Sequence, residues 1–427
     1  MASFSCGVVF CICIHKTLGG KKMKKFLSIA LVLVLIVGCF AACGTKATTD
    51  ETDASAAPSA AASGDTIKVG IIGCQTGDYA QYGLSVMNGA TLYIDQLNAN
   101  GGINGKQVEI INNDNKGDSQ EAINAFNLSV DKGITALIGD VLSGNTIAVV
   151  GEANPINMPM ITASATAAGV TYDSETDTVY TNVFRTCFID PFQGEKMANY
   201  ASEKLAAKTA AVIYETGNDY AVGVKDAFVA TCKDLGIEVV DEEGYATGDV
   251  DFKSQLTTIA SKNPDVVFCP NYYEDDGLII TQAREVGIKA TFMGSDGMSG
   301  VSAYASAADL ENTVYCSGYA PASTDAVKAF EAAYTEKYGA DTLNMFSANA
   351  YDAAMVLCNA LQVAEDAGLT AGTDEYKQAV IDAIRDKSAD LECITSKGYT
   401  FDKQNNPVKD ACIMKIVAGV ETFTETY

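Results

Sequence analysis

The stretch IKVGIIG, Ile67–Gly73, decides the fold of this chain, because it is an apolar run of strand length that ends in glycine. Four apolar residues follow it at helical spacing: Met87, Ala90, Ile94 and Leu97. A glycine pair at 101–102 ends that helix. A strand followed by a helix is the repeating unit of α/β folds, so the chain is expected to continue in the same order.

The alternation of strands and helices does continue. Strands are expected at 108–111, 134–138, 158–163, 210–214, 237–240, 266–269 and 290–293. Helices are expected at 122–130 and from Pro191, Tyr220, Phe252 and Gly277. The rhythm restarts at Arg185, so we predict an α/β fold with two similar lobes, each a parallel sheet with helices on both faces.

Polar and aromatic residues follow the ends of these strands, which is where open α/β sheets bind ligands. In chain order they are Tyr82, Ser143, Ser164, Thr166, Tyr220, Tyr272 and Asp296. Hydroxyl and N–H donors suit a carboxylate, Asp296 suits an ammonium group, and tyrosine rings can surround both. The set therefore indicates a site for a small zwitterion.

Each of these residues also has a plainer interpretation. Ser143 precedes an expected helix, so its hydroxyl would serve equally well as an ordinary N-cap. The tyrosines would pack at a lobe edge without touching a ligand. The carboxylate cluster 274–276 could suggest catalysis or metal binding, but acidic residues at a helix start favour the N-terminal dipole, and we prefer that interpretation.

No cofactor or metal is predicted. The sequence has neither GxGxxG nor a P-loop, and no pair of cysteines has CxxC spacing. The single histidine, His15, lies in a segment that we expect to be absent from the mature protein. Histidine-dependent catalysis and histidine metal sites are thereby excluded.

The N-terminal region is expected to be a secretion signal and a tether. Residues 1–22 are interpreted as untranslated leader, and residues 23–42 as a signal peptide with a short apolar segment, too short to span a bilayer. Small residues precede Cys43, the order that a lipoprotein signal peptidase cuts, so Cys43 is the predicted lipidation site. Residues 43–65, rich in Ala, Ser, Thr and Asp, form the flexible tether that holds the body at the outer face of the cell membrane. An uncleaved anchor helix and lipidation at Cys39 are the alternatives.

The chain is strongly acidic, with 54 Asp and Glu against 29 Lys and Arg. Five of those lysines lie in the segments that we expect to be removed, so the mature protein is more acidic still. A surface of this charge disfavours nucleic acid as a partner. Of the 13 cysteines, eight remain after position 43. Cys393 and Cys412 lie near the ends of two C-terminal segments, and whether they pair stays open.

The opening strand and several later motifs resemble the leucine/isoleucine/valine-binding proteins, which are type I periplasmic binding proteins. The motifs that carry this resemblance are Ile67–Gly73, Asn88-Gly89-Ala90, 98–106, Ile138-Gly139, 160–166, 282–288, 292–294 and 350–353. The resemblance covers the chain from about Thr66 to its end. It implies a two-lobed protein that captures a branched-chain or related amino acid for an ABC importer, with permease subunits and cytoplasmic ATPases as partners, and that acts as a monomer.

The resemblance also implies roles for single positions. Ser143, Ser164 and Thr166 would grip the ligand's carboxylate, and Asp296 its ammonium group. Tyr220 and Tyr272 would close from the second lobe. Tyr82 falls where some members have tryptophan, and Tyr351 resembles a hinge-side tyrosine.

Chain crossovers near Arg185, Gly318 and Gly398 would place residues 66–184 and 319–397 in lobe I and residues 185–318 and 398–427 in lobe II. The chain departs from the family at Ala167-Ala168, where Asn-Pro is common, and at Leu142, where some members have a disulfide cysteine. Because side-chain pockets diverge widely, the ligand need not be leucine. A sensor that passes occupancy to a membrane receptor, binding of amides or other small solutes, and a surface hydrolase remain alternatives, the last disfavoured because no acid–base pair can be placed.

Overall fold

The computed structural model describes residues 66–427, which contain two separate main sheets. The predicted leader, signal peptide, tether and lipidation site at Cys43 lie outside the described residues. In the part described, no helix is both long and apolar enough to cross a membrane.

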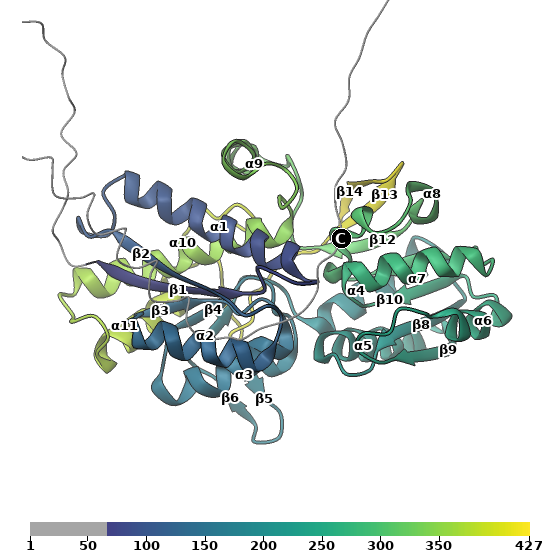
Figure 1. Ribbon diagram of the computed structural model, residues 1–427, viewed down its shortest axis with the longest axis horizontal. Helices are drawn as coiled ribbons and strands as arrows, with labels where there is room; N and C mark the ends of the chain where they lie inside the picture. Colours follow the sequence, from purple (N-terminus) through teal and green to yellow (C-terminus); the bar gives the residue numbers. More distant parts are fainter. Residues whose placement is uncertain (1–65) are drawn as a thin grey trace, which may run out of the picture. The chain divides into compact units, whose positions relative to one another are not determined.

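Lobe I is built on a five-stranded sheet of order β2-β1-β3-β4-β7, in which every pairing is parallel. Its strands are β1 (Ile67–Gly73), β2 (Val108–Asp114), β3 (Ala136–Ile138), β4 (Met160–Thr162) and β7 (Val183–Arg185). Its helices are α1 (Ala80–Ala99), α2 (Ser119–Asp131), α3 (Ser143–Ala153), α9 (Asp325–Tyr338), α10 (Met345–Asp366) and α11 (Asp374–Lys387). Helices α1 and α10 pack on one face of the sheet and α2 and α3 on the other (Figure 1).

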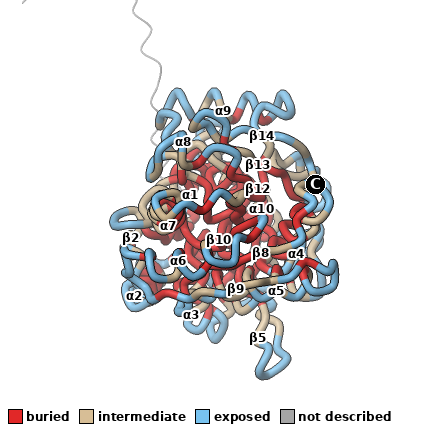
Figure 2. Tube along the Cα trace, turned by 90° about the vertical axis from the view of Figure 1, so that its right-hand side faces the viewer, coloured by how far each residue is buried: buried red, intermediate tan, exposed pale blue. Residues whose placement is uncertain are grey.

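Lobe II is built on a seven-stranded sheet of order β14-β13-β12-β11-β10-β8-β9. Its strands are β8 (Thr209–Glu215), β9 (Glu238–Tyr245), β10 (Val266–Cys269), β11 (Thr291–Gly294), β12 (Val314–Ser317), β13 (Cys412–Val417) and β14 (Val420–Thr426). Its helices are α4 (Asp190–Glu203), α5 (Asp219–Leu235), α6 (Lys253–Lys262), α7 (Tyr273–Glu285) and the short α8 (Ala307–Leu310). Strands β8, β10 and β12 are buried, whereas the loop of the small hairpin β5–β6 (Tyr172–Asp173, Thr178–Val179) is exposed (Figure 2).

The predicted fold class is confirmed: two α/β lobes form around parallel sheets. Lobe II adds a feature that was not predicted, because β13 pairs antiparallel with both β12 and β14 at the sheet edge. Boundaries also differ. Strand β9 runs to Tyr245 rather than ending at 240, since it is an edge strand whose acidic residues face solvent and hide the apolar pattern.

Two glycines of α1 explain why this helix packs so closely on its neighbours. A Cβ at Gly89 would lie 2.1 Å from the Ser347 carbonyl oxygen of α10, and a Cβ at Gly83 would lie 2.0 Å from that of Cys74. Any side chain at either position would force the backbones apart. The Asn88-Gly89-Ala90 motif is therefore a packing motif.

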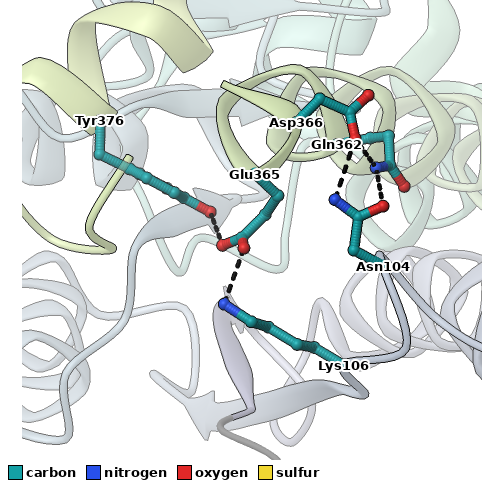
Figure 3. Close-up of polar contacts among 6 residues, drawn as sticks. All are labelled: Asn104, Lys106, Gln362, Glu365, Asp366 and Tyr376. Atoms are coloured by element: carbon teal, nitrogen blue, oxygen red, sulfur yellow. Dashed lines mark hydrogen bonds and ion pairs between the residues drawn. The ribbon is translucent and has the colours of Figure 1, made fainter. Parts of the chain in front are cut away.

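The loop that follows α1 is tied to the end of α10 by a polar cluster (Figure 3). Lys106 Nζ lies 2.7 Å from Glu365 Oε2, and the Glu365 side chain is only 5% exposed. Tyr376 of α11 donates to the other oxygen of Glu365 at 3.0 Å, and Asn104 Nδ2 donates to Asp366 Oδ1 at 2.9 Å. The cluster thus joins the loop after α1, early in the sequence of lobe I, to α10 and α11, near the end of that sequence.

The chain passes between the lobes three times, and the third crossover differs from the predicted place. The first follows β7 at Arg185 and the second follows β12 at Ser317. After Gly398, however, the chain stays on lobe I: the Phe401 ring contacts Phe184, and Asn405 Nδ2 donates to the Val183 carbonyl oxygen. The crossing occurs between Pro407 and Cys412, because packing against β7 holds residues 399–407 in place.

All eight cysteines of the described residues are free thiols. The possible Cys393–Cys412 disulfide is therefore not formed. Cys393 Sγ instead contacts Met355 Sδ at 3.8 Å.

Candidate functional site

A pocket between the lobes brings together all the predicted ligand-binding residues except Tyr351. It lies beyond the carboxyl ends of strands in both sheets. Lobe I lines it with Tyr82, Val141, Leu142, Ser143, Ser164, Thr166 and Phe346, and lobe II lines it with Tyr220, Tyr272, Asp296 and Gly297. The serine and threonine hydroxyl groups come from lobe I and the carboxylate from lobe II.

Ser143 begins helix α3, but its side chain does not cap the helix. Leu142 is the N-cap residue, and Ser143 Oγ accepts hydrogen bonds from the backbone N–H groups of Thr166 and Ala167 at 3.2 and 3.1 Å. The hydroxyl proton of Ser143 therefore stays available to an acceptor in the pocket, beside the positive end of the α3 dipole. The N-cap interpretation of this side chain is wrong.

Ser164 has the complementary arrangement. Its hydroxyl donates to the Val141 carbonyl oxygen at 2.8 Å, which leaves the oxygen lone pairs as acceptors. Together with the N-terminus of α3, Ser143 and Ser164 give the lobe I wall both donors and acceptors. Such a wall can bind a carboxylate and one edge of an ammonium group.

Asp296 supplies the negative charge of the pocket. It lies just after β11, is 2% exposed, and its backbone N–H donates to Gln193 Oε1 at 2.8 Å. Within the described residues, no group makes a hydrogen bond of good geometry to its Oδ2. Burial raises the pKa of Asp296 to about 7, and the neighbouring Tyr220 and Gln193 side chains oppose the rise. A cationic group bound here would supply the missing partner.

The pocket tyrosines both pack against one another and face the cavity. The rings of Tyr220 and Tyr272 are stacked at 5.2 Å with an interplanar angle of 3°. Tyr272 also meets Tyr79 and Tyr82 edge-on at 5.0 and 5.6 Å. The two interpretations of these residues are therefore compatible: the packing fixes the rings that line the pocket.

Tyr82 has a second role that the sequence did not suggest, because its hydroxyl joins the lobes. It donates to the Gly297 carbonyl oxygen and accepts from the Tyr273 N–H at 3.1 Å, both in lobe II. The Tyr273 hydroxyl in turn donates to the Asp78 carbonyl oxygen of lobe I at 2.7 Å. These bonds can form only while the lobes are closed. We call this set the interlobe latch.

Tyr351 does not line the pocket. It lies on α10 with its hydroxyl bonded to Gln96 Oε1 at 2.7 Å and its ring edge-on to Tyr93. Phe346, at the start of the same helix, lines the pocket instead and contacts the Tyr82 ring at 4.8 Å. A signal for Phe346 existed, since Asn344 caps α10 and places Phe346 in its first turn.

The acidic cluster 274–276 occupies the first turn of α7, as the helix-dipole interpretation expects. Asp275 accepts from the Tyr245 hydroxyl at 2.8 Å and Asp276 from Asn271 Nδ2 at 3.1 Å. A search of residues 66–427 finds no group of three or more metal-ligating His, Cys, Asp or Glu side chains.

Comparison with known proteins places this site in context. A family model described as "Periplasmic binding protein" matches residues 66–421. The Leu/Ile/Val-binding protein of Rhizobium johnstonii is 33% identical over 322 residues, 75% of this chain and 83% of that protein. The leucine-, isoleucine-, valine-, threonine-, and alanine-binding protein of Pseudomonas aeruginosa is 30% identical over 308 residues, 71% of this chain and 80% of that protein.

The likeness extends to solved structures. The branched-chain amino acid transporter substrate-binding protein of Streptococcus pneumoniae, in complex with isoleucine, is 33% identical with a TM-score of 0.76. The match covers 85% of this chain and 99% of that structure.

Proposed function

The chain belongs to the periplasmic binding protein family, and on that premise we propose that it captures a branched-chain or related amino acid between its lobes and delivers it to an ABC permease. Proteins of this family bind solutes and are not enzymes. The family also implies a location outside the cytoplasm. The choice of ligand and the delivery step are the parts that we propose.

The observation that carries the proposal is the charge pattern of the pocket. Asp296 is a buried carboxylate without a partner for Oδ2 among the described residues, and it lines the same cavity as Ser143 and the α3 N-terminus. An amino-acid zwitterion satisfies both walls at once. Its carboxylate would bind Ser143, Thr166 and the free N–H groups of α3, and its ammonium group would bind Asp296 and Ser164.

The rest of the pocket supports an apolar ligand side chain. Val141, Leu142 and Phe346 line it together with the rings of Tyr82 and Tyr272. None of the lining residues is basic, so a second acidic group on the ligand would find no partner. Leucine, isoleucine and valine fit this description, and it agrees with the names of the relatives.

Anchoring through Cys43 is part of the same proposal, although this residue lies outside the described structure. Incorporation of labelled fatty acid into the wild-type chain, and its loss in Cys43→Ser, would support lipidation at this cysteine. Incorporation that persists in Cys43→Ser would overturn it.

Thermal unfolding of residues 66–427 tests the ligand. The protein is first unfolded and refolded to remove bound solute, and is then screened against the twenty amino acids, small amides and short peptides. A ligand at about 100 times its dissociation constant stabilises the fold by about 2.7 kcal/mol, which at roughly 2–4 °C per kcal/mol raises the midpoint by several degrees. The chain has no tryptophan, so a dye or circular dichroism supplies the signal. A shift with leucine, isoleucine or valine is expected, and no shift with any amino acid would overturn the proposal.

A further inference from the structure

Lys409 is a half-buried cation that the binding site does not use, and it lies where the three interlobe crossovers meet. It belongs to the third crossover, between Pro407 and Cys412. Its Nζ donates to the carbonyl oxygen of Thr186 in the first crossover at 3.2 Å. A Cβ built on Gly318, in the second crossover, would lie 3.4 Å from the same Nζ.

The ammonium group makes its remaining contacts with lobe I. Nζ donates to Asn349 Oδ1 on α10 at 2.6 Å and to Thr395 Oγ1 at 2.7 Å. Three acceptors therefore surround a group that has three N–H donors. A neutral amine has only two N–H donors, so it would leave one of these acceptors without a hydrogen bond.

We propose that the Lys409 ammonium group is a positioning group for lobe closure, which fastens the third crossover to lobe I and so fixes the axis about which lobe II turns. The inference rests on the proposed function only where its test measures amino-acid binding. When Lys409 holds the third crossover against lobe I, the hinge allows few relative orientations of the two lobes, and the closed orientation is one of them. Without it, the open ensemble widens and closure costs more conformational entropy.

The surroundings of Lys409 decide what pH does to this contact. The titratable groups that face it are Asp352 of α10, Cys187 of the first crossover, Cys393 and Tyr399 of the segment after α11, and Cys412 at the start of β13. Burial lowers the pKa of Lys409 to about 8, and Asp352 opposes that change. Burial raises the pKa of Cys187 to about 12 and also raises the pKa values of the other two thiols and of Tyr399.

Asp352 is the acidic group of this cluster. Burial raises its pKa, but it accepts hydrogen bonds from the Ile394 N–H and from the N–H and hydroxyl of Thr395, which favour the carboxylate. The pKa of Lys409, at about 8, lies within the pH range in which this contact can be tested. The contact of the Lys409 ammonium group with lobe I is therefore expected to form at pH 7 and to weaken above pH 8.

The test compares Lys409→Met with Lys403→Met, an exposed lysine of the lobe I segment just before the third crossover. Dissociation constants for the amino acid that stabilises the wild type most are measured by calorimetry from pH 7 to 9.5. The ratio of the Lys409→Met constant to the wild-type constant is expected to be about 10 at pH 7, the value of one charged hydrogen bond, and to fall toward one at pH 9.5. The ratio cancels titration of the ligand itself. The Lys403→Met ratio is expected to stay at one.

Either of two results would overturn the inference: a ratio of one at pH 7, or the same ratio at both pH values, which a merely structural role would give. If Lys409→Met does not fold, Lys409→Arg decides, because its guanidinium stays charged. Its ratio to wild type should fall about tenfold between pH 7 and 9.5, and a constant ratio would contradict the proposal.

A ligand-free measurement separates this inference from the proposed function. Hydrogen exchange of the 408–411 backbone is expected to be about tenfold faster in Lys409→Met than in Lys403→Met at pH 7. If no amino acid binds but the exchange differs, the proposed function fails and the hinge role stands. Equal exchange rates would refute the hinge role whether or not a ligand binds.

Discussion

Replacing Tyr82 by phenylalanine removes two of the three hydrogen bonds of the interlobe latch without removing the ring that lines the pocket. The change leaves the Gly297 carbonyl oxygen without its donor and the Tyr273 N–H without its acceptor, and both groups are in the closed interface. In an open conformer these groups meet water, so the loss falls on the closed state alone.

The magnitude follows from the two bonds. Leaving a buried donor or acceptor without a partner costs about 1–3 kcal/mol, and we take a total of about 2–3 kcal/mol because some water can enter beside the smaller side chain. For a ligand that binds the closed conformer, affinity falls by the whole amount if the free protein is mainly open. At about 1.4 kcal/mol per tenfold, the dissociation constant rises roughly 30- to 150-fold.

The assay is titration calorimetry of stripped protein, with stopped-flow measurement of ligand release. Tyr351→Phe is the matched control, since it removes a hydroxyl that is bonded to Gln96 at 2.7 Å away from the pocket. We expect weaker binding and faster release in Tyr82→Phe, and wild-type values in Tyr351→Phe. A dissociation constant of Tyr82→Phe within twofold of the wild-type value, or an equal loss of affinity in Tyr351→Phe, would refute the reasoning.

Three further predictions follow from the same structure. Asp296→Asn is expected to weaken amino-acid binding by 100-fold or more, since it removes one partner of a buried charge pair. Titration calorimetry checks this, with Asp309→Asn as the control because Asp309 is a half-exposed carboxylate away from the pocket. Folding raises the pKa of Asp296 from 3.8 to about 7, so its contribution to the free energy of unfolding falls as pH rises from about 4 to 7. Affinity for the ligand's ammonium group rises over the same range. Chemical unfolding and ligand binding of wild type and Asp296→Asn are measured across this range, and stability and affinity that change in the same direction with pH would disprove the prediction. Lys106→Met is expected to lower the free energy of unfolding by about 1–2 kcal/mol in denaturant titration, because Glu365 is buried but keeps Tyr376 as a donor. The control Lys328→Met, which breaks the exposed pair with Asp325, should have no measurable effect. Equal effects of the two variants would count against a stabilising role of the polar cluster.

Much of the fold could be predicted because elements such as β1 and α1 carry their own local pattern. Strand β1 is an apolar run bounded by glycine, and α1 repeats apolar residues at helical spacing until its glycine stop. The pocket residues could be proposed because polar residues follow strand ends, where the sheet brings them together. The Asn344 cap places Phe346 in the first turn of α10, but docking of α10 on α1 decides that Phe346 rather than Tyr351 meets the pocket.

Contacts between distant segments account for the other differences. The third crossover lies after Pro407 because Phe401 and Asn405 pack on β7, more than 200 residues earlier in the chain. The hydroxyl of Ser143 turns from its helix to the 166–167 backbone for the same kind of reason. Tyr82 was predicted as a pocket residue, but the interlobe latch depends on how the lobes meet.

A crystal structure of residues 66–427 grown with the amino acid that raises the unfolding midpoint most is the most direct test of the central claim. The account predicts one amino acid between the lobes, with its carboxylate at Ser143 and the α3 N-terminus and its ammonium group within hydrogen-bonding distance of Asp296. An amino acid bound elsewhere, or bound here with its ammonium group away from Asp296, would contradict it.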